Sequence, residues 1–359
     1  MTERTTGPGR VTMAQIARQA KVSISTVSKV LNEGTDVSAE TRGMIKNLFA
    51  EVGYQRPRLK RGAGRGDIVD LVINELDSPW SLALLIGVEE VVAASGLALV
   101  VAAVHNSPKL TTRWLESQGA RGSQGVILIT SDLTQLQHKT LVQRGVPFVV
   151  VDGVTQAPQD VCSVSATNFA GGRAATEHLI ELGHRRIAVI GGPPNTASTR
   201  ARIAGYHAAV ADAGLSATPE LVRYAEFNHA GGFEATRQLL ALPDRPTAIF
   251  VCSDQQSRGV YRELALAGLE IPGQMSVVGF DDVDFAQWTT PPLTTVRQPL
   301  HEMGATAARM LLSLIDGDLL GPAQVELETT LIIRQSTMRQ QLAGLGVASL
   351  DPKVLRNGE

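Results

Sequence analysis

The stretch ELGHRRIAVIGGPPNTASTRARIAGYHAAVADAGL, residues 181–215, decides the fold class of this chain. Its centre, RIAVIGG at 186–192, is a short apolar run rich in β-branched residues, and an amphipathic stretch lies on each side. The two amphipathic stretches, 170–182 and 198–213, end at Gly183 and Gly214, which act as helix C-caps. Alternation of helix and apolar strand is typical of a parallel sheet covered by helices.

The same alternation extends in both directions from this stretch. The further apolar runs are IVDLVI (68–73), LALVVAAV (97–104), GVILI (125–129), PFVVVD (147–152), TAIFVCSD (247–254) and SVVGFDD (276–282). So long an α/β region exceeds one comfortable hydrophobic core, so we predict two doubly wound parallel-sheet lobes with a ligand between them.

Polar residues follow several of the predicted strands. They are Asp152, Ser253 with Asp254, and Asp281 with Asp282. In open α/β sheets ligands bind beyond the carboxyl ends of the strands, so we expect these residues to share a cleft. For each residue taken singly, a turn or N-cap role is the alternative.

The composition excludes several classes of protein. Hydrophobic residues make up 43% and charged residues 19% of the 359 residues, which is typical of globular proteins and not of disordered chains. No apolar run reaches the roughly 18 residues of a membrane span, and no apolar signal sequence follows Met1, so we expect a cytoplasmic protein. Cys162 and Cys252 form neither a disulfide framework nor a metal-binding pattern, so we expect no metal and no cofactor.

The net charge of −2 hides an uneven distribution along the chain. Residues 1–66 hold 12 Lys and Arg against 5 Asp and Glu, whereas residues 67–359 hold 21 against 30. A basic segment attached to an acidic body indicates a head that binds phosphates and a body with another task.

The basic segment contains three short amphipathic stretches, which run from Thr12 to Gln19, from Ser23 to Asn32 and from Ser38 to about Gly53. A Ser or Thr stands at the start of each stretch as an N-cap. The predicted inward positions are Ile16, Ala17 and Ala20, then Val27, Val30 and Leu31, then Ile45, Leu48 and Phe49. Two short helices joined by a tight turn and supported by a third form a helix-turn-helix unit that binds DNA. A protein-interaction module is the alternative, and the positive charge argues against it.

Residues 56–66, RPRLKRGAGRG, form a basic linker with three glycines. A plain tether and a DNA-contacting arm both fit this composition. Each glycine disfavours a helix by about 1 kcal/mol, so we expect an arm that follows the minor groove. Its candidate DNA contacts are Arg56, Arg58, Leu59 and Lys60.

The run VTMAQIARQAKVSISTVSKVLNEGTDVSAETRGMIKNLFAEVGY, residues 11–54, closely resembles the DNA-binding head of the lactose-repressor (LacI/GalR) family of bacterial transcription regulators. Segments 177–192, 199–215, 246–254, 276–299 and 331–337 resemble the effector-binding core of the same family. The resemblance implies a core like that of periplasmic sugar-binding proteins, with two lobes joined by three crossovers, in a homodimer that binds double-stranded operator DNA.

The resemblance also assigns DNA-binding roles within the head. It implies base contacts from Ile24, Ser25 and Lys29, phosphate contacts from Ser23, Thr26, Ser28 and Asn32, and further DNA contacts from Thr12 and Tyr54. Lys29 can bond to guanine O6 and N7, although the family usually has Arg at this position. For Tyr54, a packing role at the end of the helix is the alternative. The linker is shorter than the helical hinge of the family, so we expect less DNA bending.

In the core, the resemblance implies an effector site for a small sugar. The matching positions are Trp80, Asp152, Arg202, Phe227, Ser253, Asp254, Asp281 and Gln298. An aromatic face stacks on the apolar side of a pyranose, while Arg and carboxylates bind its hydroxyls. Lobe packing is the alternative for Trp80, core packing for Phe227 and a structural ion pair for Arg202. Segments 79–90 and 200–203 resemble regulators of plant-polysaccharide use, which implies a mono- or disaccharide and a xyloside as one candidate.

Three alternatives to a sugar-released repressor remain at this point. A corepressor-dependent regulator with a non-sugar effector has the same architecture. A plain sugar-binding transport protein would share the core but would not need the basic head. An enzyme on a doubly wound fold is disfavoured, because no dinucleotide or phosphate-binding glycine motif and no G-x-S-x-G occurs. We therefore predict no catalytic residues.

The predicted domains follow from these boundaries. They are a helix-turn-helix domain at 11–55, a hinge at 56–66, a two-lobe effector-binding and dimerisation domain at 67–338, and a tail at 339–359.

Overall fold

A computed structural model describes residues 13–31, 37–51, 66–129, 135–152, 161–319 and 322–340. The chain divides into two compact units, Met1–Ala63 and Gly64–Glu359. Each unit is described by itself. Residues 56–65 of the hinge and most of the C-terminal tail lie outside the described residues.

The first unit contains the three expected helices, α1 (Met13–Gln19), α2 (Ile24–Leu31) and α3 (Ala39–Glu51). Ser23 Oγ accepts a hydrogen bond from the Thr26 amide, and Ser38 Oγ accepts one from the Thr41 amide, so both serines cap as expected. The small core consists of Ile16, Ala17, Ala20, Val27, Val30 and Ile45, with Leu48 and Phe49 packed against it. The side chain of Leu31 lies outside the described residues.

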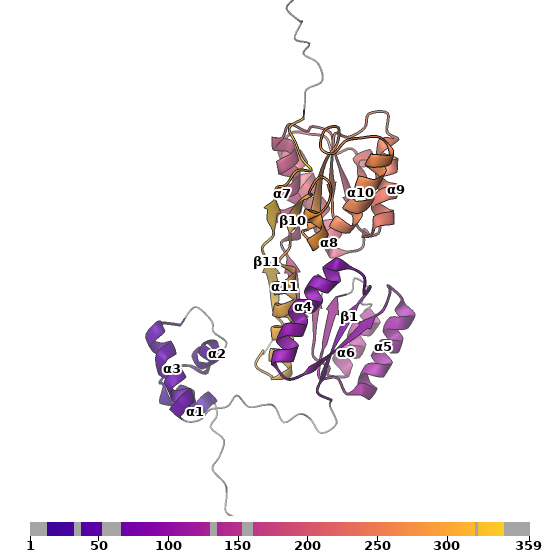
Figure 1. The fold of residues 1–359 in the computed structure, drawn as a ribbon. Helices are drawn as coiled ribbons and strands as arrows, with labels where there is room; N and C mark the ends of the chain where they lie inside the picture. The colour runs from indigo at the N-terminus through magenta and orange to yellow at the C-terminus, as the bar shows by residue number, and fades with distance from the viewer. Residues whose placement is uncertain are drawn as a thin grey trace, which may run out of the picture. The chain divides into compact units, whose positions relative to one another are not determined.

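The second unit holds two six-stranded sheets, each the centre of one lobe (Figure 1). In lobe 1 all strands are parallel in the order β11-β5-β4-β3-β1-β2. The strands are β1 (Ile68–Ile73), β2 (Ala98–Ala103), β3 (Val126–Ile129), β4 (Phe148–Val151), β5 (Cys162–Ala166) and β11 (Gln324–Leu327). The helices are α4 (Pro79–Ala94), α5 (Pro108–Arg121), α6 (Gln135–Gln143) and α11 (Leu300–Ile315). Helices α4 and α11 cover one face of the sheet and α5 and α6 the other, each over its own apolar cluster.

Lobe 2 repeats this plan with the strand order β12-β10-β9-β8-β6-β7, in which only β12 is antiparallel among the described strands. The strands are β6 (Ile187–Gly191), β7 (Val222–Tyr224), β8 (Ala248–Val251), β9 (Ser276–Asp281), β10 (Thr294–Arg297) and β12 (Thr330–Ile332). The helices are α7 (Asn168–Glu181), α8 (Ala197–Asp212), α9 (His229–Leu240) and α10 (Asp254–Leu266), with 3₁₀ turns at Pro219–Leu221 and Asp284–Gln287. Helices α7 and α8 cover one face, and α9 and α10 the other.

Three segments carry the chain from one lobe to the other, as the family resemblance implied. The first joins β5 to α7 at residues 166–168, the second joins β10 to α11 at 297–300, and the third joins β11 to β12 at 327–330. Each lobe is therefore assembled from separate stretches of sequence.

Two glycines let α7 and α8 cross in close contact. A Cβ at Gly172 would lie 2.3 Å from the Arg202 carbonyl oxygen, and a Cβ at Gly205 would lie 2.2 Å from the Phe169 carbonyl oxygen. Because the obstacle in both cases is backbone, neither position tolerates a side chain without moving a helix. The contact fixes Arg202 relative to the start of α7.

Candidate ligand cavity and DNA-reading helix

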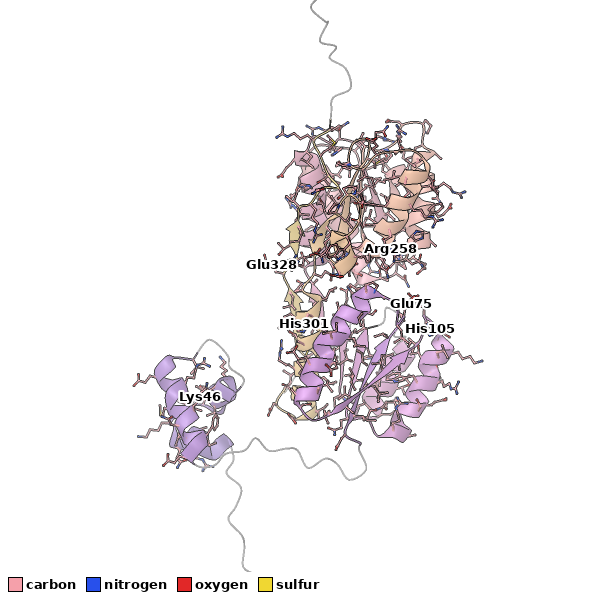
Figure 2. All side chains as sticks on the ribbon, in the orientation of Figure 1. Lys46, Glu75, His105, Arg258, His301 and Glu328 are labelled. Atoms are coloured by element: carbon pink, nitrogen blue, oxygen red, sulfur yellow. The ribbon has the colours of Figure 1, made fainter. Side chains whose placement is uncertain are left out.

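A cavity of about 300 Å³ lies between the two lobes, where the parallel strands of both sheets end. Lobe 1 contributes Asn74, Glu75, Trp80, Asn106 and Asp152, and lobe 2 contributes Asn195, Arg202, Glu226, Phe227, Ser253 and Asp281, among others. Figure 2 labels Glu75 at the edge of lobe 1 that faces lobe 2. The cavity thus lies where the strand-end argument expects a ligand.

Arg202 of α8 is the central cation of this cavity. Its Nε donates to Asn168 Oδ1 over 2.8 Å, and its Nη1 donates to the Cys252 carbonyl over 2.5 Å. Nη1 lies 3.5 Å from Asp281 Oδ1, and Nη2 lies 4.0 Å from Asp152 Oδ2. The guanidinium is thus held between a carboxylate of lobe 2 and a carboxylate of lobe 1.

The two carboxylates extend from strand ends in left-handed backbone conformations. Asp152 follows β4 with φ 50°, and Asp281 ends β9 with φ 119°. Asp281 Oδ1 accepts a hydrogen bond from Gln298 Nε2 over 2.7 Å. Burial raises the pKa of Asp281 to about 6, although the nearby Arg202 charge lowers it in part. Non-glycine residues in such conformations are concentrated at functional sites.

The aromatic ring of Phe227, from lobe 2, borders the cavity and packs against the backbone of Gly192. A Cβ at Gly192 would lie 2.1 Å from Phe227 Cζ, so the ring rests directly on the glycine backbone. Gln256 Nε2 donates to the carbonyls of Gly191, Ala225 and Glu226 and ties the loop before Phe227 to β6. The ring is therefore positioned by buried hydrogen bonds behind it.

A second ring borders the cavity from lobe 1. Trp80 lies in the first turn of α4, whose N-cap Ser78 accepts a hydrogen bond from the Ser81 amide. The indole is partly buried and packs against the lobe 1 core while also lining the cavity. Trp80 therefore has the lobe-packing position that we considered as the alternative, and it also lies where it could contact a ligand.

Six of the eight predicted ligand residues line the cavity, and two lie behind it. Asp254 is fully buried, with Oδ1 accepting from Thr295 Oγ1 over 2.7 Å and Oδ2 accepting from the Val283 amide over 3.1 Å. As the first residue of α10, it turns toward β9 and β10, while the capping Ser253 faces the cavity. Gln298 reaches the cavity only through Asp281. We expected Asp254 and Gln298 to contact the ligand directly, but neither side chain lines the cavity. Both instead form hydrogen bonds behind the residues that line it.

Several cavity residues were not predicted from the sequence. Asn74 and Asn106 follow β1 and β2, so the strand-end rule could have found them. Glu75 and Glu226 lie in loops with no recognisable pattern. Asn168, which starts α7, contacts Arg202 and was likewise missed.

The described part of the head places the DNA-reading candidates on α2. Lys29 is exposed, and Ser23 Oγ and Thr26 Oγ1 are 2.8 Å apart in a hydrogen bond at the helix start. The side chains of Ile24, Ser25 and Ser28 lie outside the described residues. The same holds for Thr12, Asn32, Tyr54, Arg56, Arg58, Leu59 and Lys60.

Among the described residues, no group of three or more His, Cys, Asp and Glu side chains has the arrangement of a metal site. None of the described helices combines the length and the apolar character that crossing a membrane requires.

Comparison with known proteins decides the family. Residues 12–57 match the model for bacterial regulatory proteins of the lacI family, and residues 176–337 match the model for a periplasmic binding protein-like domain. The ribose operon repressor of Escherichia coli K12 is 34% identical over 331 residues, covering 90% of this chain and 99% of the relative. The chain belongs to the lacI family. A second relative of this LacI-family protein, the HTH-type transcriptional regulator CelR of Thermobifida fusca, is 33% identical over 337 residues, 91% of this chain and 98% of the relative.

Solved structures of similar proteins agree with the assignment. A CelR–cellobiose complex has a TM-score of 0.72 and 34% identity, covering 91% of this chain and all of that one. A lac repressor dimer bound to operator and the anti-inducer ONPF has a TM-score of 0.69 and 28% identity, covering 92% of this chain and all of that one. The predicted fold and family are thus confirmed. The LacI-family protein is a DNA-binding transcriptional regulator and not an enzyme.

Proposed function

We propose that the protein is a homodimeric repressor that a small neutral sugar releases from a palindromic operator. The observation that carries the proposal is the inter-lobe cavity, in which Trp80 and Phe227 offer aromatic faces and Arg202 lies between two carboxylates. Aromatic faces stack on the apolar side of a sugar ring, and charged groups form the strongest hydrogen bonds to paired hydroxyls.

The charge of the cavity favours an uncharged effector. Its charged lining residues comprise one basic residue, Arg202, and four acidic residues, which are Glu75, Asp152, Glu226 and Asp281. Arg202 already contacts Asn168, Cys252 and Asp281. Excess negative potential in a cleft repels anions, so phosphorylated or acidic sugars would bind poorly.

The names of the relatives support a carbohydrate effector. Besides the ribose operon repressor and the CelR–cellobiose complex, a LacI family regulator from Enterococcus faecium was solved with bound ribose, with 26% identity and a TM-score of 0.69. Within this class, a xyloside remains the narrower expectation from segments 79–90 and 200–203.

We further propose that α2 enters the major groove and that two copies of the head read the two halves of the operator. In this geometry, dimer symmetry requires an inverted repeat in the DNA. Lys29 is the exposed basic side chain of α2, and the basic hinge would add phosphate contacts. Sugar binding acts on DNA affinity only if the sugar prefers one arrangement of the lobes over the other.

The test begins with the full chain and in vitro selection of its operator from random DNA. Fluorescence anisotropy then measures operator affinity with cellobiose, ribose or xylobiose, and with glucose 6-phosphate as the charged control. We expect at least one neutral sugar to weaken operator binding and the phosphorylated sugar to have no effect. A sugar that strengthens operator binding would establish corepression, and failure of every neutral sugar while glucose 6-phosphate acts would overturn the proposal.

A thermal-unfolding measurement on the same samples separates binding from response. A ligand present at 100 times its dissociation constant adds about 2.7 kcal/mol to the free energy of unfolding. A sugar that raises the melting temperature without changing operator affinity would contradict a regulatory role for the cavity.

A further inference from the structure

One amide side chain connects the two lobes inside the cleft. Asn168 is the last residue of the first crossover and the first residue of α7, and it is 6% exposed. Its Nδ2 donates to Asp152 Oδ1 over 3.0 Å and to the Ala166 carbonyl over 3.1 Å, both in lobe 1. Its Oδ1 accepts from Arg202 Nε of lobe 2 over 2.8 Å. One side chain thus bridges an anion of one lobe and a cation of the other.

The bridge needs the chemistry of an amide. In their ion pair, Arg202 Nη2 and Asp152 Oδ2 are 4.0 Å apart, which is too far for a hydrogen bond. Asp152 and Arg202 each form a hydrogen bond to the Asn168 side chain instead. An amide donates to a carboxylate and accepts from a guanidinium at the same time, whereas a carboxylate in its place only accepts.

The surroundings of Asn168 connect it to two of the three crossovers. The neighbouring Thr167 hydroxyl accepts a hydrogen bond from the Thr329 amide over 2.9 Å, which ties the first crossover to the third. On the other side, the close approach of α7 and α8 at Gly172 fixes the backbone of Arg202. A displacement at Asn168 therefore changes the geometry of the segments about which the lobes turn.

We propose that Asn168 is a positioning residue that sets the spacing between Asp152 and Arg202 and, through it, the relative position of the lobes. The inference rests on the proposed function, because Asp152 and Arg202 line the proposed effector cavity. Asn168 thus holds Asp152 and Arg202 at a fixed spacing before a sugar binds. A sugar whose hydroxyls bind both side chains would, through Asn168, also affect the first crossover, to which Asn168 belongs.

The test measures the distance between the lobes in the full chain without any sugar. Spin labels are placed at Glu116→Cys on α5 and Ala265→Cys on α10, two exposed positions outside the cavity lining. The native Cys162 and Cys252 are buried, so they compete little for the label. Pulsed electron resonance then gives the distance distribution for the parent chain and for two variants, Asn168→Ala and Asn168→Asp.

The two variants differ in their expected response to pH. In Asn168→Asp the new carboxylate stands against Asp152, with Arg202 and, beyond it, Asp281 as the other charges of the cluster. Two carboxylates at hydrogen-bond distance repel when both are ionised but share a proton when one is neutral. At about pH 8 we expect a displaced and broadened distribution, and near pH 5 a return to the parent distribution as the shared proton replaces the amide donor. The distance distribution of the Asn168→Ala variant should be displaced from the parent distribution at both pH values.

A matched control makes the same amide-to-acid change elsewhere in lobe 2. Gln274→Glu lies outside the cavity, where the side chain accepts a hydrogen bond from the Glu270 amide, and should keep the parent distribution throughout. Parent distributions in both Asn168 variants would overturn the inference. So would a displacement in Asn168→Asp that does not change with pH, because simple disruption of packing has no such dependence. Neither outcome depends on operator release by sugar, so the proposed function is tested separately.

Discussion

Replacing Asp281 with Asn should stabilise the protein at neutral pH while weakening its response to effector. Asp281 is 3% exposed, and burial raises its pKa from the ordinary value of 3.8 to about 6. Because the folded-state pKa lies above the unfolded value, the carboxylate charge opposes folding increasingly as the pH rises from the unfolded pKa to the folded pKa, and fully above the folded pKa. The difference of about two pH units corresponds to about 3 kcal/mol. Asn removes the charge, keeps the size and tolerates the left-handed backbone at φ 119°.

The pH dependence of this gain follows from the same linkage. Below about pH 4 the wild-type carboxyl is protonated in both states, so the Asp281→Asn substitution should bring little advantage there. The advantage should grow to about half its full value near pH 5 and reach about 3 kcal/mol above about pH 7. Denaturant unfolding of the full chain between pH 5 and pH 8 measures it directly.

Effector binding should change in the opposite direction. A hydrogen bond to a charged group contributes about 1.5–3 kcal/mol, so the Asp281→Asn variant should bind sugar roughly tenfold or more weakly. The matched control is Asp282→Asn, one residue further on. Asp282 accepts from Arg297 Nε over 2.7 Å and from Arg334 Nη2 over 2.6 Å, so this variant should be destabilised. A lower free energy of unfolding for Asp281→Asn at pH 8, or a gain that does not vary with pH, would refute the reasoning.

Four further substitutions test other parts of the molecule. Gly192→Ala should displace the Phe227 ring, lower stability by about 1–3 kcal/mol and weaken sugar binding, as calorimetry would show, whereas unchanged affinity would remove Phe227 from the site. Lys29→Ala should relax base preference at a cost of about 1–3 kcal/mol, while Arg58→Ala should weaken binding to all sequences and lower its salt dependence; competition against operator variants separates the two. Asp70→Ala should destabilise lobe 1 by about 3–5 kcal/mol, because buried Asp70 accepts from Trp114, Arg121 and Ser123; a melting temperature equal to wild type would contradict this.

The strands that could be predicted from sequence are those with continuous apolar runs, and most of them are buried, although β2 is not. IAVIG in β6 and VILI in β3 are buried along their whole length, so every residue carries the signal. The strands that were missed are short or alternate with polar residues. Strand β5, CSVSA, buries every second residue, and β11, QVEL, leaves two of its four exposed. They occur as strands because a neighbouring strand pairs with them, and a local sequence pattern does not contain that information.

The site shows a similar division. Asp152 and Asp281 could be found because parallel strands bring their carboxyl ends to one edge, a rule that needs only the order of elements. The sequence could not show that Ser253 faces the cavity while Asp254 does not, because this depends on how α10 turns away from β8. Asn168 looks like an ordinary helix-start residue, and its role depends on a contact with Arg202, 34 positions further along the chain.

The three crossovers bear on how such a regulator can be recombined. The head and the core meet at one place in the chain, near residue 63, so a chimera that exchanges the head needs a single junction. A chimera that exchanges one lobe needs three junctions, one in each crossover, and must rebuild the bridge at Asn168 and the hydrogen bond from Thr329 to Thr167. New operators can therefore be acquired by simple fusion, whereas new effectors are more readily acquired by point substitution within the cavity.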